Sequence, residues 1–139
     1  MSDFNASVLA EFRERHGTVT NAAPFGNSLV VLHTTGARSG EPRVSPVMGI
    51  PDGDGWLVAA SKAGAPDNPA WYHNLLAHPD LTVETGDGSA ITTTQVHAVD
   101  LTGAERDAAW ERFKQASPGF AEYEKRTSRT IPVLRLSPR

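Results

Sequence analysis

Short apolar runs rich in β-branched residues recur along the chain, and each is bounded by polar residues, glycine or proline. Runs of this length and composition are typical of strands. They predict six strands, at residues 28–34, 43–50, 56–61, 81–85, 90–99 and 131–136. Several connections are Gly-rich turns of only a few residues, which favours hairpins and a mainly antiparallel sheet.

A helical spacing of apolar residues replaces this pattern near the N-terminus and after the third run. The first of these segments predicts a helix at about residues 5–16, with Gly17 in the position that often follows a helix end. In the second, Asn68 is the expected N-cap and Pro69 the first residue of a helix that runs to about residue 77.

Two more helices are expected before the last strand. Thr102 and Glu105 have the spacing of a capping box, which predicts a helix to about residue 115. A short helix is expected at residues 118–125. Pro132 lies within the last predicted strand and places that strand at an edge or a bulge, because proline has no amide hydrogen to donate.

Six short strands joined by tight turns can close into a small barrel whose ends are covered by helices. We therefore expect a mainly β chain of the α+β class, built as a single domain over residues 1–139 with an N-terminal helix in residues 1–17. No GxGxxG segment links a strand to a helix, so a Rossmann dinucleotide site is not expected.

Composition and charge narrow the function classes. The chain is 39% hydrophobic and 21% charged, with a formal net charge of −3, which argues against nucleic-acid binding. It has no cysteine, which excludes thiolate nucleophiles and Cys-ligated metals. No basic, apolar leader and no run of about 18 apolar residues is present. We expect a cytoplasmic protein; contact of the N-terminal helix with the inner face of the membrane is the weaker alternative.

Two blocks of the sequence gather cations beside tight turns and small residues. The first links the first two strands and holds two glycines, two arginines and a serine: Gly36, Arg38, Ser39, Gly40 and Arg43. Glycines let backbone amides converge on an oxygen, and arginines bind phosphate or carboxylate through charge-assisted hydrogen bonds. This block predicts an anion site, although an ordinary hairpin with solvated arginines has the same pattern.

The second block follows the third strand. Its small residues suit a flat ring lying against the backbone, and the free amides of the following helix favour an anion or an electron-rich edge. A tryptophan there can stack on such a ring, but it equally fits a core position. The residues concerned are Ala59, Ala60, Ser61, Lys62, Asn68, Pro69, Ala70, Trp71 and Asn74.

Other catalytic patterns are absent from the sequence. The five histidines are scattered without H-E-x-x-H spacing, so no metal site is expected. No G-x-S-x-G segment occurs, which disfavours a hydrolase triad. By its neighbours alone, Tyr123 fits a structural role on a solvated helix.

Together, the blocks resemble the deazaflavin (F420)-dependent nitroreductase family, whose members have a split β-barrel flavin-binding fold. The resemblance covers about residues 28–138. It is carried by T-T-G-x-R-S-G-x-P-R, by A-S-K-x-G-A-x-x-N-P-x-W-Y-x-N-L and by R-T-I-P near the C-terminus. It implies a split-barrel, F420-binding core over those residues and an F420H2-dependent quinone or nitro reductase.

The resemblance also implies a chemistry and a residue set. Reduced F420 would give a hydride from its C5 carbon to an electron-poor small molecule, such as a quinone, a nitroaromatic or an activated alkene. The cofactor's phosphate and acidic tail would meet the basic hairpin, and its ring would meet the strands and the helix start. The implied cofactor-binding residues are Arg38, Ser39, Arg43, Val44, Ser45, Pro46, Ala59, Ala60, Ser61, Lys62, Asn68, Pro69, Ala70, Trp71 and Asn74.

Ser61 and Tyr123 are the candidate catalytic residues. Ser61 is placed to donate a hydrogen bond or relay a proton as charge develops on the acceptor. Tyr123 matches a position of the family's C-terminal segment that often faces the substrate. In the nitro- and quinone-reducing members the C-terminal segment tends to be richer in tyrosine, and the residue after the S-P-x step can be aromatic. Phe120 and Met48 hold those places here, which leaves the native acceptor open.

Two other functions are compatible with the same residues. One is an FMN-binding reductase of the same barrel class, because FMN also joins a flat ring to an anionic group. The other is a carrier that binds F420 without catalysis. A homodimer is an open expectation, since related split barrels commonly dimerise although monomers occur.

Overall fold

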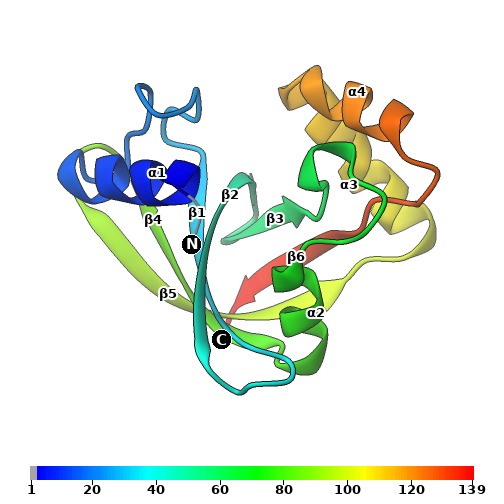
Figure 1. Cartoon of the computed structure of the whole chain (residues 1–139), viewed down its shortest axis with the longest axis horizontal. Coiled ribbons are helices and arrows are strands. Elements are labelled where there is room, and N and C mark those ends of the chain that lie inside the picture. Colours follow the sequence, from blue (N-terminus) through cyan, green and yellow to red (C-terminus); the bar gives the residue numbers. More distant parts are fainter. Residues whose placement is uncertain (1–2) are drawn as a thin grey trace.

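Six antiparallel strands close into a barrel in the computed structural model, which describes residues 3–139 (Figure 1). Around the barrel the order is β1-β2-β3-β6-β5-β4. This confirms the expected split-barrel fold, mainly β with helices. The strands are β1 (Leu29–Thr35), β2 (Pro42–Asp52), β3 (Gly55–Ala59), β4 (Asp80–Gly86), β5 (Ile91–Asp100) and β6 (Val133–Pro138).

Alternation along the strands separates an inner face from an outer face. In β1, Val30 and Leu32 point into the barrel, while Leu29 and Val31 belong to a separate cluster outside it. Side chains that alternate in this way follow from the two-residue period of a strand. The barrel core consists of Val30, Leu32, Val58, Ala60, Leu81, Val83, Val96, Ala98, Leu134 and Leu136, together with Trp71 and Leu75 from a helix.

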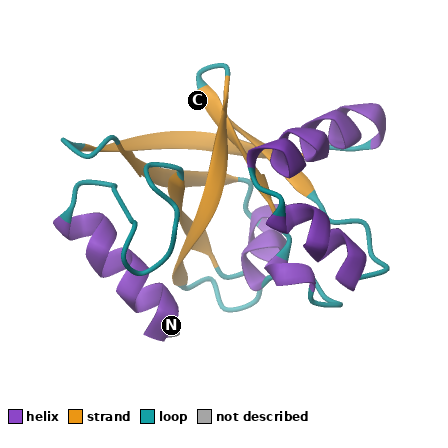
Figure 2. Ribbon diagram, turned by 90° about the horizontal axis from the view of Figure 1, so that it is seen from above, coloured by secondary structure: helices purple, strands orange, loops and turns teal. Residues whose placement is uncertain are grey.

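Helices cover the barrel on two sides and insert at one end (Figures 1 and 2). Helix α1 (Asp3–Glu14) packs on the outer face of β1, whereas α3 (Gly103–Ala116) and α4 (Gly119–Arg126) pack on β3 and β6. Helix α2 (Ala70–Ala77) follows the short 3-10 turn η1 (Lys62–Gly64) and contributes two side chains to the barrel core. No helix among residues 3–139 is long and apolar enough to cross a membrane.

The first helix ends two residues earlier than the sequence pattern predicts. Its last residue is Glu14, and both His16 and Gly17 have left-handed backbones, with φ of 55° and 100°. The Gly17 amide donates to the Phe12 carbonyl at 2.8 Å and closes the helix end. Gly17 is needed for a second reason: a Cβ on it would lie 2.3 Å from the backbone of Gly86. Residues 1 and 2 of the expected N-terminal segment lie outside the described residues.

Two expected helix caps are not formed. Pro69, not Asn68, is the N-cap of α2, because Pro69 has an extended backbone with ψ of 154°. Thr102 is the N-cap of α3 as expected, but neither it nor Glu105 completes a capping box. The Glu105 side chain instead accepts a hydrogen bond from the distant Arg135 at 2.8 Å.

The last strand does not lie at an edge. It is paired on both sides, with β3 and with β5, because barrel closure places it between them. Pro132 precedes the strand, and its carbonyl accepts a hydrogen bond from the Ala60 amide at 2.9 Å. The missing amide hydrogen of Pro132 therefore costs no ladder hydrogen bond.

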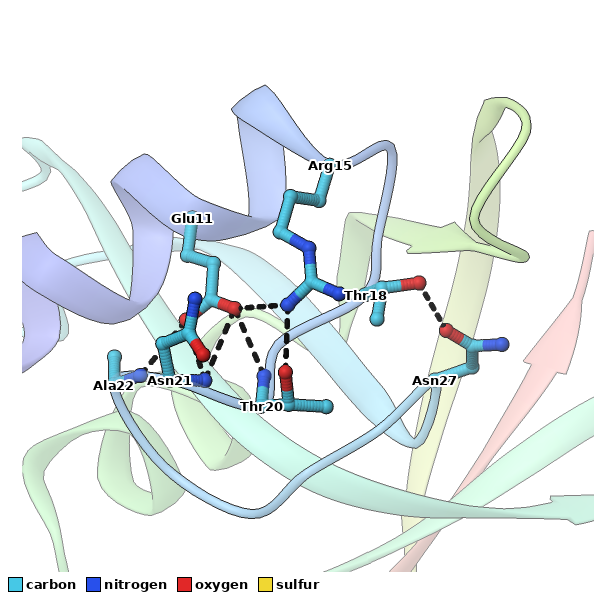
Figure 3. A network of polar contacts seen from close by, with 7 residues as sticks. All are labelled: Glu11, Arg15, Thr18, Thr20, Asn21, Ala22 and Asn27. Carbon is cyan, nitrogen blue, oxygen red and sulfur yellow. Dashed lines mark hydrogen bonds and ion pairs between the residues drawn. The ribbon is translucent and has the colours of Figure 1, made fainter.

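A buried carboxylate fixes the loop that joins α1 to β1 (Figure 3). Glu11 is only 8% exposed, and its oxygens accept hydrogen bonds from the backbone amides of Thr20, Asn21 and Ala22 at 2.8 to 3.1 Å. Arg15 adds a hydrogen bond at 2.6 Å. These donors favour the charged form, so they lower the pKa of Glu11 to about 2.

Candidate functional site

Two adjoining pockets lie where the β1–β2 hairpin meets α2. The first has a volume of about 700 Å³ and the second about 350 Å³. Ser45 and Trp71 line both of them, so the pockets share a wall. Trp71 is 8% exposed and also belongs to the barrel core, which means that the core holds this wall in place.

The first pocket has the donors that an anion requires. Arg38 and Arg43 line it, both exposed, and Arg38 has no acidic partner within residues 3–139. Arg43 shares its charge with Glu41, whose carboxylate lies 3.4 Å away. Ala70 and Trp71 also line this pocket, and they are the first residues of α2, so the positive end of the helix dipole lies at its wall.

The hairpin that carries these arginines is held to α2 by Asn74. This side chain is buried, accepts a hydrogen bond from the Ala37 amide at 2.9 Å and donates to Thr34 at 3.4 Å. Within the described chain, the amides of Arg38 and Ser39 have no acceptor. The turn therefore leaves backbone donors free beside the arginines, as the glycine pattern predicts.

The second pocket is lined mainly by apolar residue types, and α4 forms part of its wall. Phe120 and Tyr123 line it from that helix, Met48 from β2, and Ala59 and Ser61 from the end of β3. The Phe120 and Tyr123 rings meet edge to face, with centroids 5.7 Å apart. Asn5 from α1 also lines the pocket, so the first and last helices both contribute to it.

Lys62 lies at the second pocket and not beside the two arginines. Its ammonium is 3.2 Å from the Asp67 carboxylate, and this contact lowers the pKa of Asp67. Lys62, Ala63 and Gly64 all have left-handed backbones, with φ of 46°, 54° and 81°. This loop forms part of the pocket wall in a conformation that L residues rarely adopt.

The structure brings most of the predicted site residues to these two pockets. Three are elsewhere: Ala60 is fully buried, Pro46 lines neither pocket, and Asn68 binds the guanidinium of Arg129 at 2.7 Å. Those at the first pocket are Arg38, Ser39, Arg43, Val44, Ser45, Ala70, Trp71 and Asn74. Those at the second are Ser45, Ala59, Ser61, Lys62, Pro69, Trp71 and Tyr123.

Sequence reasoning missed two residues of this region. His73 lines the first pocket from α2, as Arg38 and Arg43 do from the hairpin. Arg129 lies behind the second pocket, and burial lowers the pKa of its guanidinium. The only sequence signal for Arg129 is its place in the R-T-I-P segment, which does not show what it contacts.

A third hollow of about 530 Å³ lies at the opposite end of β1 and β2. Its lining includes Trp56, Phe25 and Asp87 but no arginine or lysine. An anionic ligand would meet a carboxylate there and no cation. Chemistry therefore favours the hairpin pockets as the functional site.

Comparisons relate this chain to known proteins. The model of the F420H(2)-dependent quinone reductase family matches residues 6–138. An F420H(2)-dependent quinone reductase of Mycobacterium tuberculosis is 34% identical over 134 residues, covering 94% of this chain and 87% of its own. Among solved structures, the F420-H2 dependent reductase FDR-A is 37% identical with a TM-score of 0.66, covering 79% of this chain and 94% of its own.

Two further solved structures extend the comparison. A chain described as a domain-swapped dimer is 33% identical, with a TM-score of 0.69 over 95% of this chain and 98% of its own. The heme storage protein HutZ of Vibrio cholerae is 14% identical with a TM-score of 0.64, covering 97% of this chain and 90% of its own, and shares the fold.

Proposed function

Because this chain belongs to the F420H(2)-dependent quinone reductase family, and is accordingly an F420H2-dependent oxidoreductase, we propose that its two adjoining pockets divide the reaction between them. The first pocket binds the acidic tail of the cofactor. The shared wall orients the deazaflavin ring, and the second pocket holds the acceptor. The observation that carries this proposal is that Ser45 and Trp71 line both pockets.

The first pocket fits the anionic part of F420. The first pocket is lined by the start of α2 and by Arg38 and Ser39; among residues 3–139, the Arg38 guanidinium has no acidic partner and the amides of both residues have no acceptor. Arg38 and Arg43 can each donate charge-assisted hydrogen bonds to phosphate or carboxylate oxygens. FMN, the other ring-and-phosphate ligand that the residues allow, has no support from the relatives, whose names specify F420.

When bound, F420H2 supplies the hydride. The chain's own residues would position the reactants: Trp71 would hold the ring on one side, and Phe120 and Met48 give the second pocket apolar lining that would limit the access of water. Negative charge develops on the acceptor as it is reduced. Ser61 and Tyr123 line that pocket, and in this proposal the Ser61 hydroxyl donates a hydrogen bond to the charge, with the Tyr123 hydroxyl as a second donor.

The relatives named as quinone reductases lead us to quinones as the acceptor class. The test has two steps. Quenching of F420 fluorescence during titration with the protein should show saturable binding. Mixing the protein anaerobically with F420H2 and menadione should then reoxidise F420H2 faster than the uncatalysed reaction. Saturable binding of FMN in place of F420 would contradict the proposal, as would binding of F420 without turnover of any quinone.

We also propose that the chain forms a homodimer, since a relative with 33% identity is described as a domain-swapped dimer. Light scattering after gel filtration should then give twice the chain mass of 14.9 kDa. A mass of one chain across the micromolar range would contradict this.

A further inference from the structure

One arginine from the C-terminal segment holds the whole connection between β3 and α2. The Arg129 Nε donates to the Ala65 carbonyl at 3.0 Å, and its Nη2 donates to the Ser61 carbonyl at 2.8 Å. Its Nη1 donates to the Ala60 carbonyl at 3.2 Å and to the Asn68 side-chain oxygen at 2.7 Å. All three nitrogens of the planar guanidinium are therefore used on residues 60–68, a separation of more than sixty positions along the chain.

The contacts of Arg129 differ from those of an ordinary surface ion pair. Each of its four acceptors is an uncharged oxygen, and within residues 3–139 no carboxylate lies at ion-pair distance from it. The planar fork matches several fixed acceptors at once, which a lysine ammonium cannot do. Its role is to fix the shape of the connection, because these contacts neutralise no charge.

That shape is a strained one. Lys62 and Ala63 have positive φ values, 46° and 54°, in a region that costs L residues free energy and persists only when the surroundings enforce it. Gly64 follows with φ of 81° and touches α4, since a Cβ on it would lie 2.7 Å from the Tyr123 carbonyl oxygen. Arg129 binds carbonyls on both sides of this segment, at Ser61 and at Ala65.

We propose that Arg129 is a positioning residue for the reaction. By fixing the carbonyl of Ser61, it sets the direction in which that residue presents its hydroxyl to the second pocket. By holding the left-handed segment, it keeps Lys62 and Ala63 on the same wall. The inference rests on the proposed function, since it assigns Arg129 a part in placing the group that faces the acceptor.

The first test compares Arg129→Lys with a matched control. Arg106→Lys is the control because Arg106 is also partly buried, donates to the Ile131 carbonyl at 2.7 and 3.1 Å, and lines neither pocket. Displacement of a reacting group by about 1 Å can cost about a hundredfold in rate, so Arg129→Lys should lower kcat for menadione by about ten- to a hundredfold. Its F420 dissociation constant should change by less than about threefold, because Arg129 does not line the first pocket. Arg106→Lys should lower the melting temperature without changing kcat.

A rescue experiment separates positioning from general stability. Glycine adopts left-handed backbone without steric cost, so Ala63→Gly in the Arg129→Lys background should recover several-fold in kcat. Hydrogen exchange gives a readout independent of F420. The Gly64 and Ala65 amides, which donate to carbonyls within the segment at 2.9 and 3.0 Å, should exchange faster in Arg129→Lys and slow again in the double variant.

Three results would overturn the inference: an unchanged kcat in folded Arg129→Lys, an equal loss in Arg106→Lys, or unaltered exchange at Gly64 and Ala65. If Arg129→Lys does not fold, Gly64→Ala disturbs the same segment by another route and should show the same loss of kcat; normal turnover in that variant would also overturn it. If the wild-type protein fails to bind F420, the proposed function fails, and the exchange data still decide whether Arg129 holds the segment.

Discussion

Replacing both arginines of the β1–β2 hairpin, in Arg38→Ala/Arg43→Ala, should weaken F420 binding by about thirty- to fiftyfold. Both side chains line the first pocket and neither is buried. They differ in what they already contact: Arg43 has Glu41 at 3.4 Å, whereas Arg38 has no acidic partner within residues 3–139. The two single variants should therefore differ as well.

The magnitude follows from the exposure of these groups. A hydrogen bond to a charged group contributes about 1.5–3 kcal/mol, and solvent screening places an exposed guanidinium at the lower end. We expect about 1.5 kcal/mol for Arg38 and about half of that for Arg43, whose pairing with Glu41 is lost when the ligand binds. The sum, about 2.2 kcal/mol, corresponds to about fortyfold in the dissociation constant.

Fluorescence titration of F420 at several salt concentrations measures this effect. The double variant should bind more weakly, and its affinity should depend less on salt, because fewer charge contacts remain. Arg112→Ala is the matched control, since it removes an exposed arginine that pairs with Asp52 outside both pockets. An affinity within threefold of wild type in the double variant would refute the assignment of the hairpin, and so would an equal loss in the control.

Three further predictions concern single side chains. Ser61→Ala should lower kcat for menadione by about a hundredfold and leave F420 affinity unchanged, because the Ser61 hydroxyl stabilises the negative charge that develops on the acceptor. An unchanged kcat in steady-state kinetics would show that Ser61 has no catalytic role. Tyr123→Phe keeps the ring contact with Phe120 and should raise the KM for quinone several-fold. An unchanged KM would mean that Tyr123 lines the pocket without binding the acceptor. The lowered pKa of Glu11, about 2 against 4.5, means that its charged form stabilises the fold above pH 4.5 and that this contribution is lost as pH falls toward 2. Melting temperatures should therefore fall more steeply over that range in wild type than in Glu11→Gln, and parallel curves would contradict this.

The strands were predictable because their signals are local. Each hairpin has apolar runs on both sides of a turn, and boundaries in the structure differ by only a few residues from the expected ones. The position of the last strand in the sheet could not be predicted from its own residues. Pro132 is compatible with an edge, but closure of the barrel puts β6 between β3 and β5, and no feature of residues 131–136 encodes those neighbours.

The two helix caps failed for a shared physical reason. The side chains of Asn68 and Glu105 are suited to capping, but arginines brought near by the fold offer them charge-assisted hydrogen bonds. Arg129 is 61 positions from Asn68 along the chain, and Arg135 is 30 from Glu105. A local pattern identifies a capable donor or acceptor, but its partner depends on the tertiary structure.

In the candidate site too, the sequence predicts the residues that take part but not how the fold arranges them. Its cations and small residues stand in two compact sequence blocks, so the blocks themselves predict a site. The blocks do not show which residues line which pocket: Lys62 lines the second pocket, while Arg38 and Arg43 line the first. Arg129 escaped detection because most of its acceptors are backbone carbonyls, which every residue has and no sequence pattern marks.

The structure of a complex with F420 tests the central claim most directly. We predict that the cofactor's phosphate lies within hydrogen-bond distance of Arg38 or Arg43, and that its ring lies against the wall formed by Ser45 and Trp71, with C5 open toward Ser61. A cofactor seated in the hollow beside Trp56, or a ring whose C5 is turned away from the second pocket, would contradict the account.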